Sequence, residues 1–174
     1  MRMFVAGFVT AAVVLVVSAF CYVRFGFVDP RADTPVGALE NWVAMPSLDA
    51  AVDRHAPEMK NPVQADDANL TAGMKLYQSN CASCHGDTAH PDAVFATAFK
   101  PPAPQFAKDS PDMPENQNFY IIQHGVRLSG MPAWKQNLND QQIWQLTTFL
   151  SHMDKLPPQV AAQWKTAASA APAQ

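Results

Sequence analysis

Hydrophobic residues fill the first 24 positions almost without interruption. Residues 3 to 23 contain no charged side chain and are flanked by Arg2 and Arg24. As a helix this stretch would extend about 31 Å at 1.5 Å per residue, which matches the hydrocarbon core of a bilayer. The pattern predicts a transmembrane anchor over residues 1 to 24. A cleaved signal peptide is the alternative, because Val17-Ser18-Ala19 is an acceptable cleavage site.

A proline-containing stretch follows the anchor over residues 25 to 68, and it lacks a sustained hydrophobic period. Two short helices are predicted within it. One starts at Thr34 with Pro35 in its first turn, and the other follows Pro46 with Ser47 as its cap. We expect this stretch to be a membrane-proximal tether that lets a small domain turn between neighbours, rather than part of a core.

Two amphipathic helices bound the next region, residues 69 to 156. The first spans residues 69 to 81, and its apolar face recurs at steps of three and four: Leu70, Gly73, Met74, Tyr77. The second spans residues 138 to 153, is capped by Asn139 with Gln142 three positions later, and has this stripe: Ile143, Leu146, Leu150, Met153, widened by Trp144 and Phe149. Glycine at position 73 weakens its helix by about 1 kcal/mol relative to alanine, which favours close approach of another helix there.

The remaining segments are loops, one short helix and a tail. A short helix is predicted over residues 118 to 125, ending at Gly125. Residues 157 to 174 form an alanine-rich tail, for which we expect a frayed helix or disorder and no function. No segment alternates between apolar and polar residues as a strand does, so the predicted fold class is all-α, with residues 69 to 156 as its domain.

Charge adds one exclusion. The 174 residues carry a formal net charge of −3, and residues 25 to 174 have 10 basic against 15 acidic side chains. No basic patch of the kind that attracts nucleic acid is present in the sequence, so we expect no nucleic-acid partner.

Two cysteines and a histidine lie together in the segment CASCHG, as Cys81, Cys84 and His85. A structural zinc site would need a second ligand pair at short spacing, and the other histidines are scattered. A redox dithiol should follow a strand, and a structural disulfide would leave His85 without a purpose. The pattern C-x-x-C-H is typical of covalent haem attachment, in which both sulfurs bind the vinyl groups and the histidine binds the iron.

The iron then either keeps an open sixth position or takes a sixth ligand from elsewhere in the chain. Met131 is favoured, because it lies between Gly130 and Pro132 on a stiff turn and a thioether suits iron. The alternatives are an open site and the following side chains: Met113, Met153, His90, His124, His152. Met153 is more simply a core residue, and His90 is too near His85 in sequence to reach the opposite face.

Four stretches in order resemble a bacterial class I cytochrome c: AGMKLYQSNCASCHG, PPAPQF, HGVRLSGMPAW and the last amphipathic helix, covering residues 62 to 156. With the N-terminal anchor, the chain is similar to membrane-anchored monohaem members of that family. The resemblance implies one covalent haem c on Cys81 and Cys84, with His85 and Met131 as axial ligands. It also implies that the first and last helices cross near Gly73 and Tyr77.

The resemblance further implies a haem pocket and a function. A backbone carbonyl of the loop 101 to 104 should hold the proximal imidazole, and the following residues are expected around the haem: Tyr77, Pro102, Arg127, Trp134. The implied function is electron transfer between Fe(II) and Fe(III), with the haem domain in the periplasm and the chain in the inner membrane. The implied partners are a quinol-oxidising complex, an oxidase or a dehydrogenase.

Two other functions stay open at the level of the sequence. A peroxidase of cytochrome c type would generally resemble a two-haem protein, whereas this chain has one C-x-x-C-H. A haem sensor would need a ligand that dissociates and an output domain. Binding of small ligands to the reduced protein would favour either alternative over the electron carrier.

Overall fold

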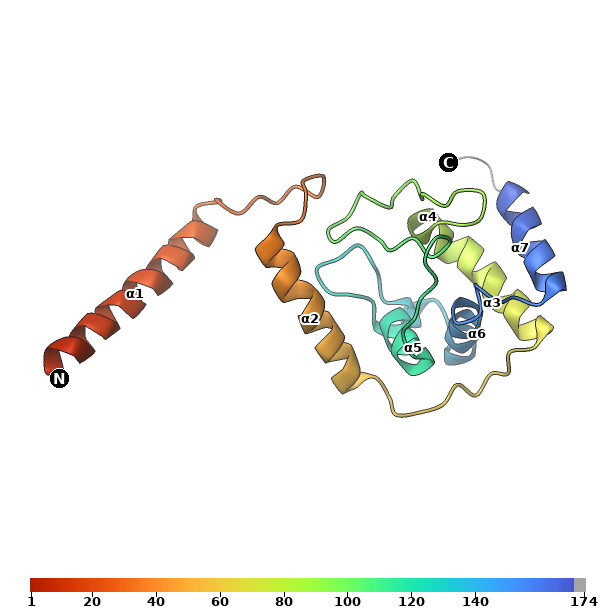
Figure 1. Ribbon diagram of the computed structural model, residues 1–174, viewed down its shortest axis with the longest axis horizontal. Coiled ribbons are helices and arrows are strands. Elements are labelled where there is room, and N and C mark those ends of the chain that lie inside the picture. Colours follow the sequence, from red (N-terminus) through yellow and green to blue (C-terminus); the bar gives the residue numbers. More distant parts are fainter. Residues whose placement is uncertain (171–174) are drawn as a thin grey trace. The chain divides into compact units, whose positions relative to one another are not determined.

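The computed structural model describes residues 1 to 170. Seven α-helices and one 3-10 helix form the secondary structure, and these residues contain no strand, which confirms the all-α prediction. The chain divides into two compact units, Met1–Ala32 and a second unit that begins at Asp33. Figure 1 shows the order of the helices along the chain.

The first unit contains helix α1, Arg2–Arg24, none of whose side chains is buried. Within the described residues it is the one helix that is long and apolar enough to cross a membrane, although a signal sequence would meet the same test. Its length agrees with the stretch of uncharged residues from which an anchor was predicted.

Helices α3, Asp67–Asn80, and α6, Asp140–Leu150, form the centre of the second unit. Asp66 caps α3 by accepting from the amide of Asn69, and Asn139 forms the predicted capping box with Gln142. The two helices cross at Gly73, where a Cβ atom would collide with the carbonyl oxygen of Gln145. The predicted close contact between these helices is therefore confirmed, and its reason is backbone contact that only glycine permits.

Three shorter helices surround this pair. They are α4, Ala82–His85, α5, Glu115–His124, and the 3-10 helix η1, Trp134–Gln136. Helix α5 packs on α6 through Phe119, whose ring stacks on that of Trp144 at 4.0 Å between centroids. Gly125 ends α5 with φ +67°, a conformation that favours glycine.

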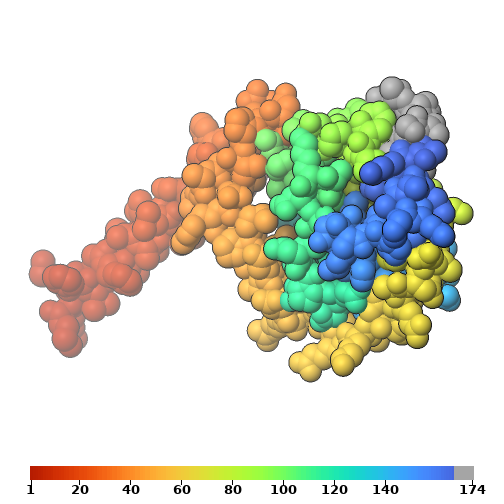
Figure 2. All heavy atoms as spheres, turned by 45° about the vertical axis from the view of Figure 1, so that its right-hand side comes forward, coloured from red at the N-terminus to blue at the C-terminus, as the bar shows by residue number. Residues whose placement is uncertain are grey.

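The C-terminal segment is more ordered than the sequence predicted. Helix α7, Pro158–Ala170, buries Val160 and Trp164 in the core, and the Trp164 ring contacts those of Tyr77 and Phe149. Figure 2 shows α7 in blue, covering one side of this unit. The expectation of a frayed helix or disorder is thus wrong for this helix, because two apolar side chains one turn apart fasten it. Residues 171 to 174 lie outside the described residues.

The segment after the anchor also differs from the expected pair of short helices. A single helix, α2, Ala38–His55, runs through Pro46. The Ser47 hydroxyl does not cap a new helix but donates to the carbonyl oxygen of Val43. Further along, Asn61 Nδ2 donates to Thr148 Oγ1 at 2.8 Å, which attaches the segment to α6. Residues 38 to 63 are therefore part of the second unit rather than a free tether.

Candidate haem site

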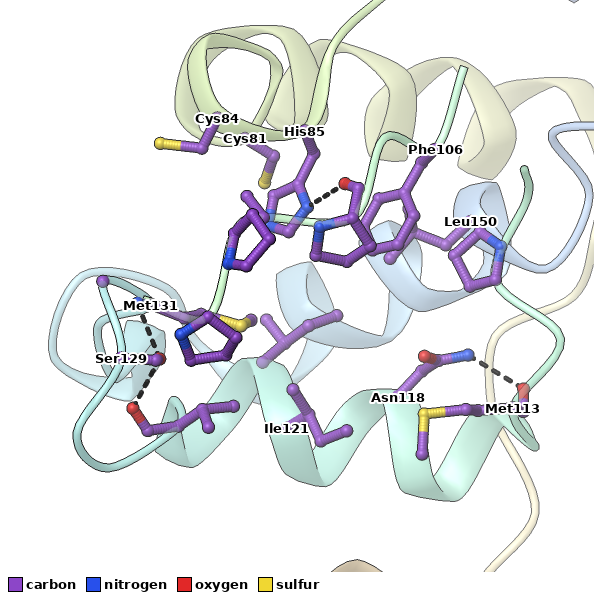
Figure 3. A pocket seen from close by; sticks show the side chains of 18 of the residues that line it. Cys81, Cys84, His85, Phe106, Met113, Asn118, Ile121, Ser129, Met131 and Leu150 are labelled. Atoms are coloured by element: carbon purple, nitrogen blue, oxygen red, sulfur yellow. Dashed lines mark hydrogen bonds between the residues drawn. The ribbon is translucent and has the colours of Figure 1, made fainter. Parts of the chain in front are cut away.

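One large cavity, about 740 Å³, opens between α4, α5 and the loops that follow them. Its lining is mainly proline, aliphatic and aromatic, and both cysteines of the CASCHG segment reach it. Figure 3 shows Cys81, Cys84 and His85 on one side of this cavity, and Met131 on the other. Met131 lies 46 positions after His85 in the sequence, and the fold brings the two to one site.

The imidazole of His85 is fixed from two directions. Its Nδ1 donates to the carbonyl oxygen of Pro104 at 2.9 Å, which confirms the expected contact with the proline loop. The Phe106 ring stacks on it with centroids 4.4 Å apart and planes 1° from parallel. Because the hydrogen bond occupies Nδ1, Nε2 is the nitrogen available to a metal, and the partner fixes the tautomer as expected for a metal histidine.

Burial shifts the pKa values of two side chains on this side of the cavity, His85 and Cys81. It lowers the pKa of His85, against the opposing effect of the Pro104 hydrogen bond, and so favours the neutral imidazole that binds metals. Burial, with a smaller effect of Cys84, raises the pKa of Cys81 to about 12. At neutral pH the Cys81 side chain is therefore a thiol.

Met131 is held by a compact loop. Its amide donates to Ser129 Oγ at 3.1 Å, and that hydroxyl donates to the carbonyl oxygen of Val126 at 2.7 Å. The amide of Val126 in turn donates to the carbonyl oxygen of Met131 at 3.2 Å, which closes the loop. In Figure 3 the Met131 sulfur points into the cavity opposite His85.

The alternative ligands lie elsewhere. Met113 lines the cavity but lies at its far end, beside Asn118, whose Nδ2 donates to the Met113 carbonyl oxygen. The other four do not line the cavity: Met153, His90, His124, His152. His90 Nδ1 lies 3.3 Å from Asp87 Oδ1. Met153 packs on the core, as the sequence suggested.

Of the four residues predicted around the haem, three line the cavity and one does not. Tyr77, Pro102 and Trp134 line the cavity. The hydroxyl of Tyr77 donates to the carbonyl oxygen of Gly86 at 2.7 Å, next to His85. Arg127 is exposed and does not line the cavity, so its expected place around the haem stays a prediction.

Sequence reasoning missed two residues that hold the site together. Phe106 stacks on His85, and Gln105 Nε2 donates to the carbonyl oxygens of Cys84 and Ala103. Both belong to the segment PPAPQF, so the only sequence signal was their position directly after a proline loop.

Comparison with known proteins agrees with this arrangement. Residues 68–150 match the family described as "Cytochrome C oxidase, cbb3-type, subunit III". Cytochrome c6 of Parathermosynechococcus lividus is 31% identical over 83 residues, which cover 48% of this chain and 88% of that protein. The chain belongs to the class I cytochrome c family. Membership implies a covalent haem c and haem-mediated electron transfer.

Other similar proteins cover the same part of this cytochrome. Cytochrome c6 of Synechococcus elongatus is also 31% identical over 83 residues, 48% of this chain and 88% of that protein. The cbb3-type cytochrome c oxidase subunit CcoP of Azospirillum sp. (strain B510) is 30% identical over 99 residues, 53% of this chain. The match spans 31% of CcoP, so the chain covers about a third of that relative. Among solved structures, a reducing HAO-like protein complex of Kuenenia stuttgartiensis shows a TM-score of 0.43 at 19% identity, over 54% of this chain and 48% of that one.

The cavity of this cytochrome fits the cofactor that its family implies. Two thiols lie at one side, a neutral imidazole presents Nε2, and a thioether lies across an apolar interior. Such donors would suit a covalently attached haem whose iron takes one histidine and one methionine ligand.

Proposed function

We propose that this chain is a membrane-anchored monohaem cytochrome c, an electron carrier or a cytochrome subunit of an oxidase, whose haem is attached to Cys81 and Cys84. The observation that supports it is the placement of His85 and Met131 on opposite sides of one apolar cavity. When bound, the haem supplies a one-electron couple between Fe(II) and Fe(III).

The protein's own residues determine how that couple behaves. His85 is oriented by Pro104 and Phe106, and Met131 is held by its loop, so both would stay bound to the iron in either oxidation state. A thioether ligand and an apolar cavity both favour the less charged reduced state, so they raise the potential. With His85 and Met131 both bound to the iron, the haem would exchange electrons and would have no open position for a substrate.

Helix α1 and the similarity to CcoP support a location and a class of partner. Helix α1 anchors the chain, with the haem unit on the periplasmic side of the bacterial inner membrane, where cytochromes c receive their haem. Donor and acceptor are redox proteins at that surface, and the cbb3-type oxidase named in the family description makes an oxidase complex the first partner to test. A peroxidase is not favoured, since the relatives named above are a cytochrome oxidase subunit and cytochromes c6.

A redox titration of the purified full chain in detergent tests this function. The wild type should show one covalent haem, a one-electron midpoint and the Met–iron(III) charge-transfer band. Met131→Ala should lose that band and lower the potential, whereas Met113→Ala, at the far end of the same cavity, should keep both. An unchanged Met131→Ala spectrum, or loss of the band in Met113→Ala, would overturn the ligand assignment.

A further inference from the structure

Helix α2 presents one face to the haem cavity. Four of its residues line the cavity together with the cysteines and His85: Asn41, Met45, Leu48, Asp49. Their spacing places them on the same side of a helix, and Val52, one turn beyond Leu48 on that side, is buried with 2% exposure. A segment outside the matched cytochrome region 68–150 therefore forms part of the cavity.

The C-terminal half of α2 is fastened to α5. Gln117 Nε2 donates to Asp53 Oδ1 at 2.7 Å, and Asn116 Nδ2 donates to the carbonyl oxygen of Pro57 at 3.0 Å. Both amides lie in the first turn of α5, and their partner Asp53 directly follows buried Val52. These contacts determine where the preceding turns of α2 lie, and Figure 2 shows α2 (orange) against the segments coloured green.

The other face of α2 points away from the cavity. Leu39 and Val43, four residues apart on that face, are 74% and 51% exposed, and neither lines the cavity. The same helix thus carries two sets of residues with different surroundings. Substitutions on the two faces of α2 can therefore be compared. The positions lie in the same helix and close together in sequence, and one set faces the haem cavity while the other does not.

We propose that α2 forms a wall of the haem site, and that Met45 and Leu48 exclude water from the bound haem and so raise its reduction potential. The physical reason is that Fe(III) carries one more positive charge than Fe(II), so water or a negative charge at this wall stabilises the oxidised state. The inference rests on the proposed function, because it concerns the same haem. It assigns to the juxtamembrane helix a role beyond that of a linker.

The test compares aspartate substitutions on the two faces of α2 in the full chain in detergent. Met45→Asp and Leu48→Asp should each favour the oxidised state at least threefold, a fall in midpoint of about 28 mV at 59 mV per tenfold. Leu39→Asp and Val43→Asp add the same charge on the exposed face and should change the ratio by less than half as much. Met45→Gln, which is polar but uncharged, should shift in the direction of Met45→Asp and guards against misfolding.

A second substitution tests whether α2 acts through its position. Val52→Asp should release the helix from α5, and in that background Met45→Asp should have little further effect. Three results would each overturn the proposal that α2 walls the haem site. They are equal shifts in midpoint potential from the two faces, no shift from Met45→Asp and Leu48→Asp, and full additivity of Met45→Asp with Val52→Asp. A wild type without covalent haem or without the Met–iron(III) band would instead refute the proposed function, so the two failures are distinguishable.

Discussion

The hydroxyl of Tyr77 offers a sharp test of how the fold supports the segment that contains His85. Tyr77 is fully buried, and its hydroxyl donates to the carbonyl oxygen of Gly86 at 2.7 Å. Tyr77→Phe removes this donor but keeps the ring, which contacts Phe149 and Trp164 with centroids 5.6 Å away in each case. The perturbation is therefore one hydrogen bond with no loss of packing.

The expected cost follows from the burial of the acceptor. Gly86 is buried, so its carbonyl oxygen has no ready replacement in water. Leaving a buried acceptor unsatisfied costs about 1 to 3 kcal/mol, which corresponds to about a 5- to 150-fold change in the unfolding equilibrium. We expect the free energy of unfolding of Tyr77→Phe to fall by that amount.

Guanidinium unfolding of the oxidised full chain in detergent, followed by haem absorbance, measures this change. The denaturant slope should stay that of the wild type, because the same surface is exposed on unfolding. Tyr120→Phe is the control, since Tyr120 is half-buried and contacts His124 at the surface, and it should change the stability by less than about 0.5 kcal/mol. A Tyr77→Phe variant as stable as Tyr120→Phe would refute the reasoning.

Three further predictions concern the same core. Trp164→Ala should reduce the free energy of unfolding by about 3 to 5 kcal/mol, because a buried aromatic ring of α7 is lost, while exposed Gln163→Ala should be neutral; a loss below about 1 kcal/mol would contradict a core role for α7. Gly73→Ala should destabilise the protein in the same assay, although alanine is the better helix former by about 1 kcal/mol, since its Cβ would meet the backbone of α6; a stabilised variant would show that the helices are not in contact there. Burial raises the pKa of Tyr77 above its ordinary value, so the unfolded chain loses this proton first, and wild-type stability should fall relative to Tyr77→Phe as the pH rises above about 10; parallel pH profiles would contradict this burial effect.

The haem-attachment segment and the main helices were readable from the sequence because their signals are local. C-x-x-C-H is a contiguous chemical pattern, and a helix cap such as Asn139 with Gln142 needs only its own turn. The apolar period of α3 and α6 likewise states which face will be buried, and Gly73 marked the place of closest approach. The ligand roles of His85 and Met131 stay predictions that the cavity supports.

The surroundings of the site depended on contacts between distant segments. Pro46 and Ser47 looked like a helix boundary, yet α2 continues through them because Val52 is buried and Asp53 is bonded to α5, more than 60 residues away in sequence. The alanine-rich tail gave a weak local signal, and its helix is fastened by burial of Val160 and Trp164.

The sequence by itself therefore determined the chemistry and the principal helices of this cytochrome c, since those depend on neighbouring residues. Only the tertiary structure decided what surrounds the haem cavity: Phe106 against His85, α2 along one wall and α7 behind Tyr77. The physical reason is that an apolar side chain is buried only when a second surface covers it. A short segment with one or two apolar side chains therefore takes a defined position only when the segment that it packs on is in place.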